Sequence, residues 1–178
     1  MIIIINGSLG VGKSSVSEEL HYKFVKSVYL DGDYIGYVHP FEIYDSARVD
    51  HLYRTIALLV GFHQQNGYQH FVINYVFESA NSLQALLDQL TPLEPSIHTF
   101  WLTCAQDEQA DRIRGRGQDQ VDWELARFVE LNRIQAAAAQ QGFIGKQVDT
   151  SGLSAAQVAE GIWQELASQD GFDFEGHK

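Results

Sequence analysis

The chain has 178 residues, 45% of them hydrophobic and 20% charged, which is the size and balance of one globular domain. Its net charge of −11 argues against nucleic acid or an anionic membrane surface as a partner, because both require a basic face. A single cysteine, Cys104, excludes an internal disulfide, and the short apolar run at the N-terminus fits neither a signal sequence nor a membrane span, so we expect a cytoplasmic protein.

The first elements of the chain frame a glycine-rich motif. A β-branched run at Ile2–Ile5 predicts a strand buried on both faces. Helical spacing of Val16, Leu20 and Phe24 predicts a helix shortly after it. Between them, Gly7–Ser14 reads G-S-L-G-V-G-K-S, which has two glycines, a lysine and a hydroxyl residue at the spacing of a phosphate-binding loop.

Such a loop points backbone N–H groups at an anion in front of a helix N-terminus. We therefore expect Lys13 to reach the β- and γ-phosphates of a nucleotide and the Ser14 hydroxyl to bind Mg²⁺. The residues of the loop expected to contact the nucleotide are Gly7, Ser8, Leu9, Gly10, Val11, Gly12, Lys13 and Ser14.

The rest of the chain continues an alternation of strands and helices. Strands are expected at 27–30, 70–76, 97–103 and 146–149. Helices are expected at 46–65, 79–90, 106–113, 122–140 and 154–167, the last of them capped by Thr150 and Ser151. This order predicts a three-layer α/β fold with a parallel sheet and helices on both faces. Residues 1–168 form the expected domain, and residues 169–178 are expected to be a frayed tail.

The order of these motifs resembles the small P-loop kinases. It combines the phosphate loop near residue 7, Asp31-Gly32-Asp33 after the second strand, and an arginine- and glycine-rich segment near residue 114. That group includes nucleoside monophosphate, shikimate and gluconate kinases and antibiotic phosphotransferases, and the opening Met-Ile-Ile-Ile-Ile-Asn-Gly is most similar to the tunicamycin-resistance type. The resemblance implies a P-loop NTPase fold with a five-stranded parallel sheet in the order 2-3-1-4-5, and ATP and Mg²⁺ as cosubstrates.

The resemblance also implies roles for an acidic pair and for the strand that follows it. Asp31 would hold Mg²⁺ through water together with Ser14, and Asp33 would be the general base toward an acceptor hydroxyl. Many relatives carry an aspartate where this chain has Asn74, which cannot neutralise Mg²⁺, so the acidic work falls on Asp31 and Asp33 or on Glu78. This departure leaves open a nucleotide-binding protein without transferase activity.

A lid is implied at about residues 112–120, where Gly115 and Gly117 are expected to break the preceding helix. Among its arginines, one would stack on the adenine and others would hold the transferring phosphates, so Arg112 and Arg116 join Lys13 and Asp33 as expected catalytic residues. The further positions expected at the nucleotide are Ser15 at the α-phosphate, Arg112, and Asp149 and Thr150 over the adenine edge. A GTPase switch is the competing class, but the sequence has no N-K-x-D motif.

An aromatic segment lies where members of this group bind the phosphate acceptor. Its residues are Tyr34, Tyr37, His39, Phe41 and Tyr44, followed on the next helix by Arg48, His51 and Arg54. Aromatic and polar groups together suit a nucleoside-like or antibiotic acceptor, although the same aromatics also suit a simple cover for the end of the sheet. The expected partners are ATP and this small molecule, in a monomer or homodimer.

Overall fold

The computed structural model describes residues 1–117 and 120–168. Its strands form one parallel sheet in the order β2-β3-β1-β4-β5, which confirms the predicted fold class and strand order. The strands are β1 (Ile2–Gly7), β2 (Ser27–Asp31), β3 (His70–Asn74), β4 (Ile97–Thr103) and β5 (Lys146–Asp149). The expected tail at residues 169–178 and two lid positions, 118 and 119, lie outside the described residues.

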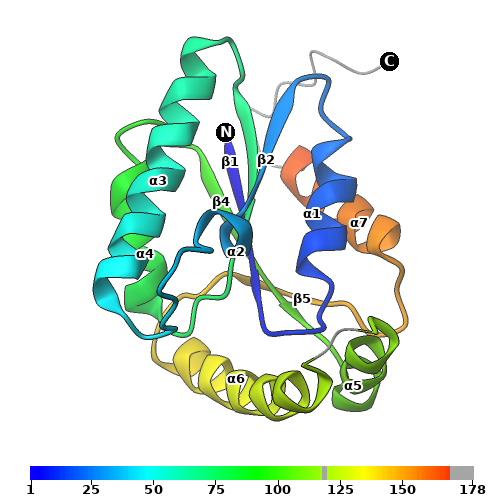
Figure 1. Ribbon diagram of the computed structural model, residues 1–178. Helices are drawn as coiled ribbons and strands as arrows, with labels where there is room; N and C mark the ends of the chain where they lie inside the picture. Colours follow the sequence, from blue (N-terminus) through cyan, green and yellow to red (C-terminus); the bar gives the residue numbers. More distant parts are fainter. Residues whose placement is uncertain (118–119, 169–178) are drawn as a thin grey trace.

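Two layers of helices enclose the sheet (Figure 1). Helices α3 (Ser46–Gln65) and α4 (Ala80–Leu90) cover one face, and α1 (Lys13–His21) and α7 (Ala155–Ala167) cover the other. The central strand supplies both cores, because Ile2 and Ile4 pack toward α3 and α4 whereas Ile3 and Ile5 pack toward α1 and α7. All four isoleucines are at most 1% exposed, as expected for a strand buried on both faces.

The remaining helices lie at the carboxyl ends of the strands. Figure 1 shows α5 (Gln106–Gly115) and α6 (Val121–Gln141) across the end of the sheet at which β1 runs into α1. The short α2 (Gly32–Ile35) follows β2 at the same end. Ligands of parallel α/β sheets bind at this edge. The described helices include none that is long and apolar enough to cross a bilayer.

Several predicted boundaries were wrong for local reasons. Helix α7 is capped by Ser154, which forms a capping box with Gln157, so Thr150 and Ser151 are not its cap. Helix α5 continues through Gly115, and a left-handed backbone appears only at Gly117, with φ of 63°. Strand β3 ends at Asn74 instead of reaching residue 76, and Asp31 caps a short helix, α2, for which no helix was predicted.

Candidate functional site

The loop between β1 and α1 has the backbone of an anion site. Gly10 and Gly12 adopt left-handed conformations, with φ of 78° and 97°, and Gly12 stands at the N-cap of α1. A Cβ at Gly10 would lie 2.9 Å from the Gln109 carbonyl oxygen, so only glycine lets the loop pack this closely on α5. No side chain caps the N-terminus of α1, which leaves its N–H groups to face a phosphate.

A buried polar network fixes this loop against α5 and α6. The Gln109 amide donates to the Ser8 hydroxyl at 2.5 Å and also to the Leu9 carbonyl oxygen. The Ser8 hydroxyl donates to Asn132 Oδ1 at 2.5 Å, and the Asn132 amide donates to Gln109 Oε1 at 2.8 Å. The Ser8 side chain therefore anchors the loop to α5 and α6, while the Ser8 backbone remains part of the phosphate loop.

Lys13 lies folded back over the loop. Its Nζ donates to the Ser8 carbonyl oxygen at 3.0 Å, and the residue is 8% exposed. Burial lowers the pKa of Lys13, the nearby Asp33 and Asp31 raise it, and Arg116 lowers it further. A desolvated ammonium with few partners gains strongly from a polyphosphate, which fits the expected role at the β- and γ-phosphates.

Ser14 and Asp31 lie together at the start of α1. The Ser14 hydroxyl donates to Asp31 Oδ2 at 3.3 Å, and the same carboxylate oxygen accepts from the Tyr29 hydroxyl at 3.1 Å and from the Asn74 amide at 3.2 Å. The other oxygen, Oδ1, accepts from the Asp33 N–H at 2.9 Å. A hydroxyl and a fixed carboxylate beside a phosphate site are the oxygen donors that suit Mg²⁺, which keeps several waters and takes few protein ligands. The residues present therefore fit the ion.

Asn74 helps to orient Asp31. Its buried amide donates to the Tyr29 hydroxyl at 2.6 Å as well as to Asp31, and the three side chains form a closed triangle. Burial and the Asp31 charge raise the pKa of Tyr29, so its hydroxyl remains a donor. Sequence reasoning treated Asn74 as a loss and missed Tyr29. The alternation of β2 offered a signal, because Tyr29 and Asp31 lie two residues apart on one face of the strand.

Asp33 lies between the phosphate loop and a large cavity. The Asp33 side chain is exposed, but nearby protein atoms still desolvate its carboxylate in part, and this desolvation raises its pKa. The positive charges of Lys13 and Arg48 oppose the rise in pKa, and the negative charge of Asp31 adds to it. Asp33 also lines the cavity. One carboxylate is thus coupled to the lysine of the loop and faces the space beside it.

Arg112 joins the phosphate loop to the turn after β5. Its guanidinium donates to the Val11 carbonyl oxygen at 3.3 Å, to the Thr150 hydroxyl at 3.1 Å and to the Thr150 carbonyl oxygen at 2.9 Å, and it pairs with Glu108 at 2.6 Å. These contacts place Arg112 beside a cavity of about 260 Å³, which Asp33 does not line. The cavity is lined by Gly10, Val11, Gly12, Ser15, Val16, Arg112, Arg116, Thr150, Leu153, Ala155 and Val158.

The other predicted residues of this side differ in their surroundings. Arg116 lines the smaller cavity and acts electrostatically on Lys13. Arg114 is exposed and pairs with Asp111 at 2.8 Å. Asp149 does not line the cavity; it accepts hydrogen bonds from the Ser151 N–H and hydroxyl, which lower its pKa and shape the turn.

The large cavity measures about 680 Å³ and lies between α3, α4 and α6. Of the predicted acceptor residues, Phe41, Tyr44 and Arg48 line it. The other predicted residues do not line it: Tyr34, Tyr37, His39, His51 and Arg54. Tyr34 and Tyr37 are 85% and 81% exposed. The segment that carries them is irregular, so the sequence offered no period from which to assign a face.

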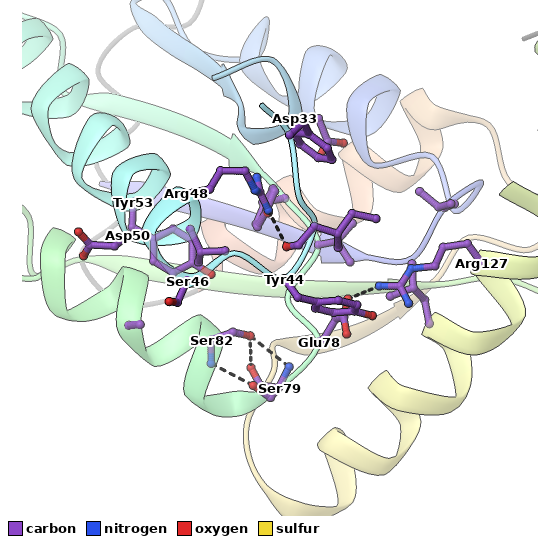
Figure 2. Close-up of a pocket in the computed structure, with 18 of the residues that line it drawn as sticks. Asp33, Tyr44, Ser46, Arg48, Asp50, Tyr53, Glu78, Ser79, Ser82 and Arg127 are labelled. Carbon is purple, nitrogen blue, oxygen red and sulfur yellow. Dashed lines mark hydrogen bonds and ion pairs between the residues drawn. The ribbon is translucent and has the colours of Figure 1, made fainter. Parts of the chain in front are cut away.

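Figure 2 shows how side chains from separate parts of the chain line this cavity. Arg48 from α3 and Arg127 from α6 lie on opposite sides of the cavity, and Arg127 pairs with Glu78. Tyr53, Tyr75 and Trp123 also line the cavity, whereas Phe77 is fully buried in the core. These residues come from three separate segments, namely α3, the chain after β3, and α6.

A family model described as an AAA domain matches residues 3–135, which include the phosphate loop, Asp31 and α5. The chain belongs to this AAA domain family. No curated protein matches the chain. Among solved structures, it is similar to the tunicamycin resistance protein of Deinococcus radiodurans, with a TM-score of 0.64 and 22% identity over 93% of this chain and 94% of that one.

Two further structures share the fold. The shikimate kinase of Acinetobacter baumannii, solved with shikimate, has a TM-score of 0.62 and 16% identity over 94% of this chain and 93% of that one. A gluconokinase from Sinorhizobium meliloti 1021 has a TM-score of 0.60 and 15% identity over 93% of this chain and 90% of that one. The chain is therefore an AAA domain family member with the fold of small P-loop kinases, which supports a nucleotide-binding phosphotransferase in general terms.

Proposed function

We propose that this protein transfers the γ-phosphoryl group of ATP to a hydroxyl of a small molecule, with Mg²⁺ as the required ion. The observation that carries the proposal is the position of Asp33. Its carboxylate is coupled to Lys13 of the phosphate loop and lines the 680 Å³ cavity, so the donor and acceptor spaces meet at one ionisable group. A nucleotide-binding protein without transfer has no need for this junction.

The nucleotide is proposed to occupy the loop and the smaller cavity. Its phosphates would face the N-terminus of α1 and Lys13, and its base would lie beside Arg112 and Thr150. Bound Mg²⁺ would neutralise charge on the phosphates, with Ser14 as a ligand and Asp31 holding coordinated water. The contacts of Arg112 favour nucleotide binding over a direct role in transfer, which leaves Arg116 as the lid arginine nearer the phosphates.

Asp33 is proposed as the general base. An alcohol needs an oriented carboxylate that accepts its proton as the bond to phosphorus forms, and a raised pKa makes a carboxylate a better acceptor near neutral pH. The protonated Asp33 would return its proton to water after product release. Asn74 and Tyr29 would act on the step only through Asp31, as positioning residues.

The test compares wild type with Asp33→Asn. ADP formation is measured with Mg²⁺ and ATP in the presence and absence of a panel of alcohols, and ATP affinity is measured by calorimetry. We expect kcat to fall by roughly 10²- to 10⁴-fold in the variant while ATP affinity stays near wild type. A matched Glu19→Gln variant, which removes an exposed carboxylate from the far side of α1, should change neither quantity. Retention of most of the wild-type kcat by Asp33→Asn would move the base role to Glu78.

A further inference from the structure

The large cavity of about 680 Å³ is the proposed acceptor cavity, and the charged side chains in its wall bear on which acceptors can bind. Within the part of the chain that the structure describes, its lining includes four carboxylates and two cations. The carboxylates are Asp33, Asp50, Glu78 and Asp88, and the cations are Arg48 and Arg127. Whether an anionic substrate can bind there depends on whether either arginine is available to it.

Arg127 is already neutralised from two directions. It pairs with Glu78 and, at 2.6 Å, with Glu130, and its side chain is only 10% exposed. Its guanidinium also lies 5.6 Å from the centre of the Tyr44 ring, on which it rests. An incoming phosphate would have to displace both carboxylates, and the loss of those pairs would offset what the new contact contributes.

Arg48 is bound to the backbone of the same cavity wall. Its Nε and Nη2 donate to the carbonyl oxygens of Glu42 and Ile43, both at 2.9 Å, and its guanidinium lies 4.7 Å from the centre of the Phe41 ring. The residue is 7% exposed. Two of its donors are thus used within the protein, and the buried guanidinium shapes the aromatic wall, although it forms no ion pair among the described residues.

The helix N-termini at this cavity are capped as well. The Ala47 N–H of α3 donates to the Asp45 carboxylate at 2.9 Å, which places a negative charge at that end. At α4, the Ser82 N–H donates to the Ser79 hydroxyl and the Ser79 N–H donates to the Ser82 hydroxyl, both at 3.1 Å. One N–H group of each helix N-terminus is thus satisfied by a side chain, and at α3 the Asp45 carboxylate also opposes an incoming anion.

The remaining wall is apolar and partly exposed. Phe41, Tyr44 and Trp123 are 48%, 71% and 48% exposed, and Ile43 and Tyr75 continue this surface. A volume of about 680 Å³ suits a ligand of drug-like size, and covering these rings would remove apolar surface from water.

We propose that the acceptor is an alcohol with an apolar body and with no phosphate or carboxylate group, either neutral or positively charged. This inference rests on the proposed phosphotransfer for the word acceptor, but the charge selection is a property of the cavity itself. The hydroxyl lies toward Asp33, the body lies against the aromatic wall, and the far end lies toward Asp88, which is exposed on α4. Anionic substrates are disfavoured because Arg127 is ion-paired and Arg48 is held in the wall by backbone carbonyl oxygens, while four carboxylates line the cavity.

The test uses four probes that share a phenylethyl body and differ in the polar group it carries: phenylethanol, phenylethylamine, 3-phenylpropionate and phenylethyl phosphate. A non-hydrolysable ATP analogue with Mg²⁺ first fills the phosphate loop, so that anions cannot bind there. Trp123 lies in the cavity wall and reports binding by fluorescence, with Trp123→Phe as the control that assigns the signal. We expect the alcohol and the amine to bind at least about tenfold more tightly than the carboxylate and the phosphate. Equal or tighter binding of either anion, or no binding of the alcohol up to its solubility limit, overturns the proposal.

A charge-matched pair of variants tests the stated cause. Glu78→Gln/Glu130→Gln frees Arg127 and should improve affinity for phenylethyl phosphate by about tenfold. Glu18→Gln/Glu19→Gln removes the same charge from an exposed face of α1 and should leave that affinity unchanged. Equal gains in both variants would show that net charge, and not the pairing of Arg127, controls selection. If the first variant does not fold, the wild-type probe series still decides the proposal.

Probe binding needs no chemistry, so the two proposals fail separately. Exclusion of anions without phosphorylation of any alcohol would contradict the proposed function and leave the charge selection standing. Phosphorylation of an anionic acceptor would do the reverse.

Discussion

The phosphate loop and the acceptor cavity meet at Asp33 but use their polar groups in opposite ways. In the loop, side chains such as Gln109 hold the backbone, and backbone N–H groups and Lys13 are left to meet a ligand. In the cavity, Arg48 is held by backbone carbonyl oxygens and Arg127 is ion-paired, and apolar surface is left exposed. One region is prepared for charge and the other for an apolar body. The two regions therefore differ in whether their cations are left to meet a ligand, which is the basis of the two proposed binding sites.

The largest expected effect breaks the loop and spares the cavity. Lys13→Ala should lower phosphotransfer by about 10³-fold or more, because it removes a buried charge aimed at the transferring phosphate. The fold should persist, since the ammonium makes one hydrogen bond and is otherwise a desolvated charge. Kinetics and calorimetry with ATP measure the loss, and Trp123 fluorescence measures binding of phenylethanol. Binding of that probe should change by no more than about twofold; a parallel fall of both affinities would contradict the separation of the two regions.

The next effect concerns the ion. Asp31→Asn keeps the size of the side chain but removes the carboxylate. That carboxylate accepts hydrogen bonds from the Ser14 and Tyr29 hydroxyls and from the Asn74 amide. The Mg²⁺ concentration needed for half-maximal binding of an ATP analogue should rise by about tenfold, as for other groups that orient a metal ligand. Calorimetry over a Mg²⁺ series gives this value without turnover. An unchanged requirement would remove Asp31 from the metal site.

Comparison of these residues shows what the sequence could predict. The alternation of elements and the resemblance together predicted the sheet order, which the structure confirms. Ser14 and Asp31 were also named in advance, because a motif of fixed spacing and a strand end in a parallel sheet each have one place in this fold. The pair of Arg127 and Glu78 was not predicted, because it joins α6 to the end of β3 through side-chain packing that no local period encodes. Residues of the phosphate-binding site can thus be predicted from local motifs, whereas the ion pairs that line the cavity depend on contacts between distant segments.

Titration of Asp33 gives a smaller effect that links function to stability. Its folded pKa is raised above the ordinary value of 3.8, so the folded state binds the proton more tightly and loses stability as the pH rises through that raised pKa. Asp33→Asn should therefore be more stable than wild type at pH 7, and this advantage should vanish below pH 3.8, where Asp33 is protonated in both states. Thermal unfolding of both proteins over pH measures it. A variant less stable than wild type at pH 7 would show that Lys13 and Arg48 outweigh burial.

The same titration shapes the pH profile of activity. The acid limb of kcat/KM in wild type should lie above the range of an ordinary aspartate, because the base must be ionised. In Asp33→Asn this limb should disappear, whereas Glu19→Gln should keep it. Persistence of the limb in Asp33→Asn would assign it to another group.

The smallest expected effect is a change in local protection at the lid. We propose that the end of α5 moves about Arg116 and Gly117, because Arg112 is held by the turn after β5 and Gly117 has a left-handed backbone. Hydrogen exchange in the peptide covering 113–117 should slow by at least about fivefold when an ATP analogue is added. Peptides from α3 serve as the internal control and should not change. High protection before the analogue is added would mark a rigid helix end.

³¹P NMR shows whether a phosphoryl group passes from ATP to an alcohol beside Asp33. The protein is incubated with Mg²⁺, ATP and each alcohol that binds in the Trp123 assay. We expect the γ-phosphate signal to decline while a phosphate monoester of the alcohol and ADP form in equal amounts, and we expect Asp33→Asn to slow the formation of both. ATP and alcohol bound together at saturation, with no monoester formed or with inorganic phosphate as the sole product, would contradict the proposed transfer.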